Sequence, residues 1–129
     1  MKTIQALILA ISTFLACSLY AVESAAADWI AVAATHWKDG GGTAHSAIGY
    51  SGIRHSEADA RAAALDACNS SGGVGCNVLG AWDSGCIYVT SGRSSDKAGY
   101  GAGASAAEAL SNCQGEGLVC KQSVGGCIE

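Results

Sequence analysis

Residues 56–68 read SEADARAAALDAC and residues 105–113 read SAAEALSNC, and these two stretches decide the fold. In each stretch a serine is followed three residues later by an acid. The serine can accept a hydrogen bond from an unpaired backbone N–H, and the acid faces the positive end of the helix dipole. Each stretch ends in Ala-Leu-x-x-Cys before a turn that contains glycine. The pattern predicts two Ala-rich helices, each with its leucine toward a sheet.

The segments around these helices match each other in the same order and are typical of strands. Residues 29–32 (WIAV) and 86–89 (CIYV) alternate β-branched residues with others, which is the period of a strand. Each leads through a polar loop to a Gly-Tyr pair, at residues 49–50 and 99–100. Strand, loop and strand in this order predict a β-hairpin in each half.

A strand that begins at a cysteine closes each half, at residues 76–79 and 120–124. The unit strand, strand, helix, strand therefore occurs twice, in residues 28–85 and 86–129. Residues 28–129 are enough for a single domain. We expect an α+β fold of two pseudo-symmetric repeats, with antiparallel sheet and two helices.

The first 27 residues have the pattern of a secretory signal peptide. An apolar run over residues 4–15 follows a single lysine, and the alanines at 25–27 fit the small-x-small rule for cleavage. The run is too short to anchor the mature chain across a membrane. Residues 14–17 also resemble a lipoprotein box, so a lipid anchor at Cys17 is the alternative. Either route predicts a periplasmic or secreted protein.

The chain has 7 cysteines, and an even number remains once Cys17 is cleaved off or lipidated. In a short exported chain this count predicts a disulfide framework. Of the many possible connectivities, only a few respect the repeated unit. The scheme we favour ties each helix end to the next strand and joins the two halves once. Its pairs are Cys68 with Cys76, Cys113 with Cys120, and Cys86 with Cys127.

Composition excludes some classes of partner. The formal net charge is −4, and the lysines and arginines are scattered singly along the chain. Nucleic-acid binding by phosphate neutralisation is therefore not expected.

The succession of motifs resembles a bacterial secreted family called domain of unknown function 4189. The resemblance covers residues 28–129 and implies the same disulfide-stapled fold. It implies no settled activity, catalytic residue or cofactor. The residues that carry it are Gly49, Tyr50, Ser51, residues 57–68, Cys76, Cys86, Cys113, Cys120 and Cys127.

The residues that could carry chemistry form no recognisable catalytic motif. His36 and His45 flank the first hairpin loop and could face one another across it, but with His55 they match no helical ligand spacing. No Gly-x-Ser-x-Gly elbow is present, and disulfides would remove the cysteines as nucleophiles. We expect no metal, no cofactor and no enzyme activity.

One glycine pattern has a structural explanation. Residues 101–106 satisfy G-x-G-x-x-A, but the parallel crossover unit of a dinucleotide site is missing. On a strand, glycines 99, 101 and 103 share one face. We expect them to let another backbone approach closely.

Trp37, Lys38, Asp39 and Trp82 are the candidate binding residues. Each tryptophan lies beside charge and glycine, a pattern typical of an exposed turn, and solvated tryptophans are frequent binding anchors. We place the working surface on the loop at residues 36–42, where three glycines predict mobility, with Trp82 as a second anchor. The alternative for both tryptophans is packing over the sheet.

These observations favour an exported binding module that occupies a partner protein, as an inhibitor, an immunity-type protein or a secreted interaction protein does. The alternatives are a small secreted hydrolase that uses Asp and His on the hairpin loops, and a structural envelope protein.

Overall fold

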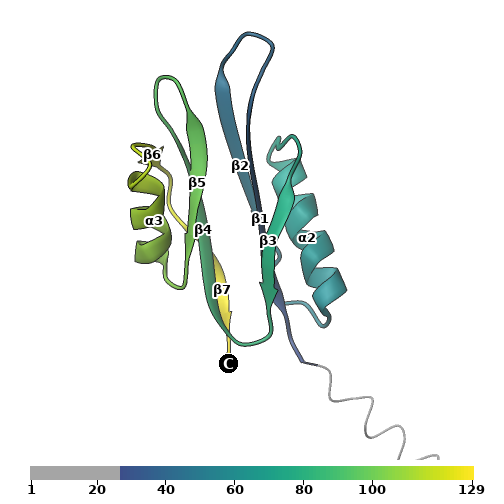
Figure 1. Ribbon diagram of the computed structural model, residues 1–129. Helices are drawn as coiled ribbons and strands as arrows, with labels where there is room; N and C mark the ends of the chain where they lie inside the picture. The colour runs from purple at the N-terminus through teal and green to yellow at the C-terminus, as the bar shows by residue number, and fades with distance from the viewer. Residues whose placement is uncertain (1–26) are drawn as a thin grey trace, which may run out of the picture.

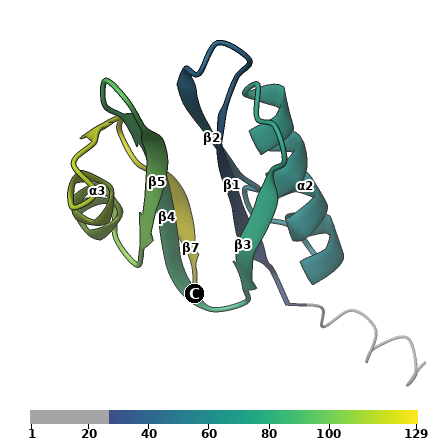
Figure 2. The ribbon, with the colours of Figure 1, turned by 45° about the horizontal axis from the view of Figure 1, so that its top comes forward.

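The computed structural model describes residues 27–129, which form two antiparallel sheets between two helices. Helix α2 lies outside one sheet and helix α3 outside the other, so the layers follow the order helix, sheet, sheet, helix (Figure 1 and Figure 2). The predicted α+β class is confirmed. The elements are β1 (Ile30–Lys38), β2 (Ala44–Tyr50), α2 (Glu57–Ser70), β3 (Asn77–Trp82), β4 (Gly85–Arg93), β5 (Ala98–Gly103), α3 (Ala106–Gln114), β6 (Val119–Cys120) and β7 (Val124–Ile128).

Each half of the chain builds its own sheet around its first strand. The first sheet has the order β2-β1-β3, and in the second β4 pairs with β5 on one side and with β6 and β7 on the other. The order strand, strand, helix, strand thus appears in both halves. Alternation along β1 and β4 turns one set of side chains toward the helix and the other toward the opposite sheet.

Both helices begin at the serines that the sequence indicated. Ser56 Oγ accepts from the N–H of Asp59 at 3.1 Å, and Ser105 Oγ accepts from the N–H of Glu108 at 3.1 Å. Each bond satisfies one of the backbone donors that a helix leaves unpaired in its first turn, and such a cap contributes about 1 kcal/mol.

The helices face the sheets with small side chains. Helix α2 buries Ala60, Ala64 and Cys68, which are spaced four residues apart along one stripe. Leu65 and Leu110 lie beside the buried stripes and are only half-buried. We expected each leucine to face a sheet, and Leu65 does pack against the core cluster under α2. The centre of the contact is nevertheless made by alanine and cysteine, because the close approach of helix and sheet leaves room only for small residues there.

Glycines on the strands permit this approach. A Cβ added to Gly49 would collide with the α2 backbone at Ala64 and Cys68, and one added to Gly101 would collide with the α3 backbone. The close approach expected of the strand glycines is therefore confirmed at Gly101. The matching of Gly49-Tyr50 to residues 99–100 is wrong by two, because Gly101 is the residue that meets the helix backbone as Gly49 does.

The core between the sheets is formed by the Ile-x-Val pairs of the two first strands. Ile30, Val32 and Val89 are 0% exposed and Ile87 is 7% exposed. Tyr50 packs against this cluster. Burial, with a smaller contribution from a neighbouring tyrosine, raises the pKa of Tyr50.

The last strand of each half contains one extra residue. On β3 the register with β1 shifts so that Leu79 has no partner. In the second half the residues from Cys120 to Val124 lie opposite the shorter stretch of β4 between Val89 and Gly92. The expected continuous strand over residues 120–124 is therefore wrong, because regular pairing stops at Cys120 and resumes at Val124, although the N–H of Lys121 still donates to the carbonyl of Ser91 at 2.9 Å.

Three disulfides join the pairs that the repeated unit favoured. Two of them close rings of sequence separation 8 and 7 between a helix end and the following strand. Cys86–Cys127 has a separation of 41 and joins β4 to β7. Both of its cysteines belong to the second half, so this bridge does not link the two sheets, and the expectation that it joins the halves is wrong.

The expected signal peptide, apart from Ala27, and the alternative lipid anchor at Cys17 lie outside the described residues. Among residues 27–129, neither helix has the length and hydrophobicity that crossing a bilayer would require.

Candidate functional site

The surface between the tips of the two hairpins is the best candidate for a binding site. Along β1 the side chains directed at the opposite sheet change from Ile30 and Val32 to His36 and Lys38. The first pair is buried and the second is exposed. His36 and Lys38 therefore add nothing to the hydrophobic core between the sheets. Their position at this end of β1 points to a role other than stabilising the fold.

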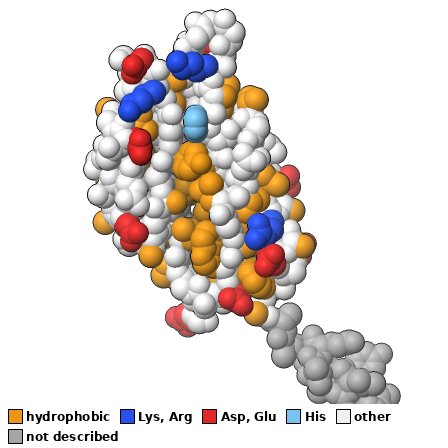
Figure 3. Space-filling view, in the orientation of Figure 1, with side chains coloured by type: hydrophobic (Ala, Val, Ile, Leu, Met, Phe, Trp, Pro, Cys, Tyr) orange, Lys and Arg blue, Asp and Glu red, His pale blue; other side chains and the backbone are white. Residues whose placement is uncertain are grey.

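Two shallow cavities share His36 and Lys97 at this end of the molecule. One, of about 250 Å³, also contacts Tyr100, and the other, of about 320 Å³, also contacts Trp37 and Lys38. The rings of His36 and Tyr100 lie 6.2 Å apart between centroids. We call His36, Trp37, Lys38, Lys97 and Tyr100 the hairpin-end surface. Basic side chains and a histidine gather where the hairpins project (Figure 3).

The charges of this surface are not neutralised by ion pairs. Among residues 27–129, no carboxylate lies within 4.0 Å of the ammonium groups of Lys38 or Lys97. Glu116 lines the same cavity as Lys97 without forming such a pair. The hairpin-end surface can therefore attract an acidic group.

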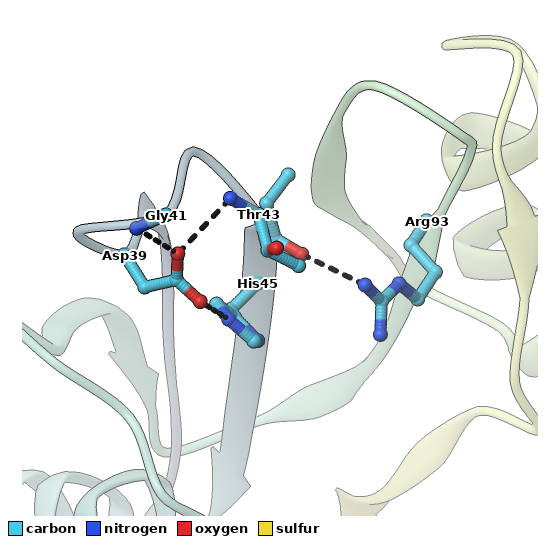
Figure 4. A network of polar contacts seen from close by, with 6 residues as sticks. Asp39, Gly41, Thr43, His45 and Arg93 are labelled. Carbon is cyan, nitrogen blue, oxygen red and sulfur yellow. Dashed lines mark hydrogen bonds and ion pairs between the residues drawn. The ribbon is translucent and has the colours of Figure 1, made fainter.

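Asp39 holds the first hairpin turn in one conformation (Figure 4). Its Oδ1 accepts from the N–H of Gly41 at 2.9 Å and of Thr43 at 3.0 Å, and its Oδ2 lies 2.8 Å from His45 Nε2. The bond with His45, followed by the backbone bonds, holds the pKa of Asp39 below its ordinary value. The glycine-rich loop, expected to be mobile, is thus tied at its base by one carboxylate.

Trp37 and Lys38 belong to strand β1 and not to the loop expected at residues 36–42. The strand continues to Lys38, and the turn begins at Asp39. Trp37 is half-buried, packs against the core under α2 and stacks on His45 with ring centroids 5.3 Å apart. Its placement at the loop tip is therefore wrong, because the cross-strand stack with His45 extends the hairpin.

Trp82 lies far from Trp37, so the structure does not bring the two proposed anchors together. Trp82 pairs with Ile30 at the start of β1, whereas Trp37 is near its end. Seven residues of strand separate them, a distance of about 23 Å. Trp82 is half-buried, packs against the inter-sheet core and covers Gly80. It is the last residue of β3 and not a turn residue.

The histidines of the first hairpin do not face one another. His36 pairs with Ser46, and His45 pairs with Trp37, so the two imidazoles lie on opposite faces of the sheet. His55 lies 3.1 Å from Asp28. Within the described part of the chain, no three His, Cys, Asp or Glu side chains are grouped closely enough to hold a metal ion.

Comparison with protein families gives one match, over residues 22–127, to a family described as a domain of unknown function (DUF4189). The chain belongs to the DUF4189 family. Neither curated proteins nor solved structures gave a match to this DUF4189 chain.

The motif residues that resemble DUF4189 serve the fold. Gly49 lets α2 approach, Tyr50 packs between the sheets, and Ser51 Oγ accepts from the N–H of Ala31 at 2.8 Å. These residues stabilise the fold and are not part of the hairpin-end surface.

Lys97 and Tyr100 are the site residues that sequence reasoning missed. They belong to the second hairpin, where the sequence pattern indicates only a polar loop followed by a Gly-Tyr strand. A usable signal was present in β1, where the inward positions change from isoleucine and valine to His36 and Lys38. That change marks the point along β1 beyond which the two sheets no longer enclose a hydrophobic core.

Proposed function

We propose that this DUF4189 chain is an exported binding module that acts by occupying a partner protein, as an inhibitor or immunity-type protein does. The docking surface is the hairpin-end surface, and the partner presents an acidic segment to it. The observation that carries the proposal is the cluster of basic and aromatic side chains around His36 where the inter-sheet core ends.

Charge supports this choice of partner. The chain carries a formal net charge of −4, yet Lys38 and Lys97 line one shallow cavity together. Complementary charge on a partner would steer the encounter and set the orientation of docking, whereas buried aromatic contacts supply affinity. Tyr100, which is half-buried and lies beside His36, is placed to make such a contact.

Rigidity supports occupation of a partner as the mode of action. Three disulfides and the hydrogen-bonded Asp39 turn leave little conformational freedom to lose on binding. A preorganised surface binds more tightly for the same contacts. The disulfides are also consistent with an oxidising compartment, as export to the periplasm or beyond would provide.

The test is a capture experiment with matched charge variants. The mature chain is immobilised and exposed to periplasmic extract, and the captured protein is then purified and titrated by calorimetry. Lys38→Gln with Lys97→Gln should raise Kd at least about tenfold, whereas the control Arg54→Gln with Arg61→Gln should not. Equal Kd values for the two double variants would refute the proposed surface.

A second candidate function is hydrolysis, which one observation favours. Asp39 Oδ2 lies 2.8 Å from His45 Nε2, an arrangement that orients an imidazole for general base catalysis. Among residues 27–129, no serine hydroxyl forms a hydrogen bond with His45, so the pair lacks a nucleophile and would have to activate water. A hydrolase screen in which any activity survives His45→Gln would remove this candidate.

A further inference from the structure

A third cavity is lined by residues from both halves of the chain. It has a volume of about 230 Å³ and is lined by His45 and Ser46 of β2, Ser91 and Arg93 of β4, and Lys121 beyond β6. At about 30 Å³ for each water molecule of the liquid, a volume of this size corresponds to about eight water molecules. The cavity therefore suits a small polar group and not a large ligand.

Strand β4 shows why a polar cavity forms at this place. Its side chains directed at the opposite sheet are Ile87 and Val89 in the core, followed by Ser91 and Arg93. Ser46 on β2 faces them, and its Oγ donates to the carbonyl of Gly92 at 3.3 Å. The inter-sheet layer therefore becomes polar here, as it does on β1.

The hydroxyl of Ser91 is a donor without a protein partner. Ser91 is 5% exposed, and among the described residues its Oγ forms no hydrogen bond. It nevertheless retains some access to solvent, as a cavity-lining oxygen would. A hydroxyl that lines a cavity and is not engaged by the protein can donate a hydrogen bond to an oxygen atom bound there.

The charged groups around the cavity are cationic and unpaired. Within the part of the chain that the structure describes, Arg93 and Lys121 form no ion pair. One guanidinium nitrogen of Arg93 donates to the carbonyl of Ala44 at 3.2 Å, which orients the group (Figure 4). Within residues 27–129, the carboxylate that pairs with His45 is that of Asp39, and its two oxygens are engaged by His45 and by the backbone of the turn.

We propose that this cavity is a binding site for an anionic oxygen group, a carboxylate or a phosphate. Arg93 and Lys121 provide the positive charge, and Ser46 and Ser91 provide neutral hydroxyls. A guanidinium held in place is well suited to planar or tetrahedral oxyanions, because its N–H groups can donate in parallel. Val119, which is 81% exposed and pairs with Arg93, provides an apolar rim.

NMR titration of the ¹⁵N-labelled mature protein tests the site without any knowledge of a partner. Sodium phosphate is the probe in one arm and the dipeptide acetyl-Asp-Glu in the other, both at constant ionic strength set with sodium chloride. We expect saturable shifts at the amides of residues 91–93 and 121. The arm that saturates at lower concentration identifies the oxyanion. Shifts that do not saturate in either arm overturn the proposal.

Charge variants then locate the response. Arg93→Gln and Lys121→Gln should each weaken the saturable binding about tenfold or more. Arg61→Gln, which removes a cation from the exposed face of α2, should leave it unchanged. If Arg93→Gln fails to fold, Lys121→Gln decides alone. Equal binding by the Lys121 and Arg61 variants would overturn the site.

The outcome is independent of the proposed docking surface. If the chain binds the ion saturably but its Kd for the captured partner does not change in the Lys38 and Lys97 variants, only the docking surface is refuted. Capture that depends on those lysines without any saturable ion binding would refute only the anion site.

Discussion

Replacing Gly49 by alanine should strongly destabilise the fold. The added methyl would meet the backbone of α2 at the carbonyl of Ala64 and the N–H of Cys68, closer than real Cβ atoms approach. A flexible side chain could move away, but a helix backbone held by the Cys68–Cys76 disulfide must shift as a unit. Overpacking usually costs 1–3 kcal/mol, and here we expect about 3 kcal/mol, near the upper end.

Thermal unfolding of the oxidised protein measures this cost, and Gly40→Ala is the control. A Cβ on Gly40 would meet nothing within 4 Å, so the same loss of glycine freedom occurs there without a clash. For a domain of this size, about 3 kcal/mol corresponds to a fall in Tm of about 15 °C. Tm values for Gly49→Ala and Gly40→Ala within about 3 °C of each other would show that α2 does not rest on the strand as described.

Three further outcomes follow from the turn, the long disulfide and the stacked tryptophan. The pKa of Asp39 is lower in the folded chain than in the unfolded chain, so ionised Asp39 should stabilise the fold fully above its unfolded pKa, and this stabilisation should be lost as the pH falls through its folded pKa. A ¹³C titration of the Asp39 carboxyl group should show the lowered pKa, and His45→Ala should raise it. Replacing Cys86 and Cys127 together by serine should cost about 4 kcal/mol in urea unfolding, since this bridge closes the longest ring, and a loss below about 1 kcal/mol would contradict the loop-entropy estimate. Trp37→Ala should cost about 2 kcal/mol, roughly half the loss for a fully buried tryptophan, and an unchanged Tm would mean that the ring does not pack as described.

The features that could be predicted from the sequence are those decided by neighbouring residues. Ser56 and Ser105 cap helices through bonds to residues three positions later, so the helix starts were visible as a pattern. The short disulfides are similar, because Cys68–Cys76 and Cys113–Cys120 each tie a helix end to the next strand.

The features that could not be predicted depend on which face of a strand meets which layer. Glycines 99, 101 and 103 share one face, and a period of two does not show which of them contacts α3. A strand face that packs against a helix and a strand face that packs against another sheet show the same two-residue alternation of apolar side chains. The sequence therefore does not reveal that the chain forms two sheets packed on each other. Trp37 and Trp82 had similar local contexts, and only the pairing of β1 with β2 and β3 shows that they lie far apart.

The most direct test of the proposed function is to map where a captured partner touches the chain. Amide shifts of the ¹⁵N-labelled protein, recorded with the purified partner, report the contact surface residue by residue. We predict that perturbed amides cluster at residues 36–45 and 93–100, around Lys38, Lys97 and Tyr100, and are absent near Trp82. Perturbations centred on residues 80–86, with the hairpin tips unaffected, would contradict the account.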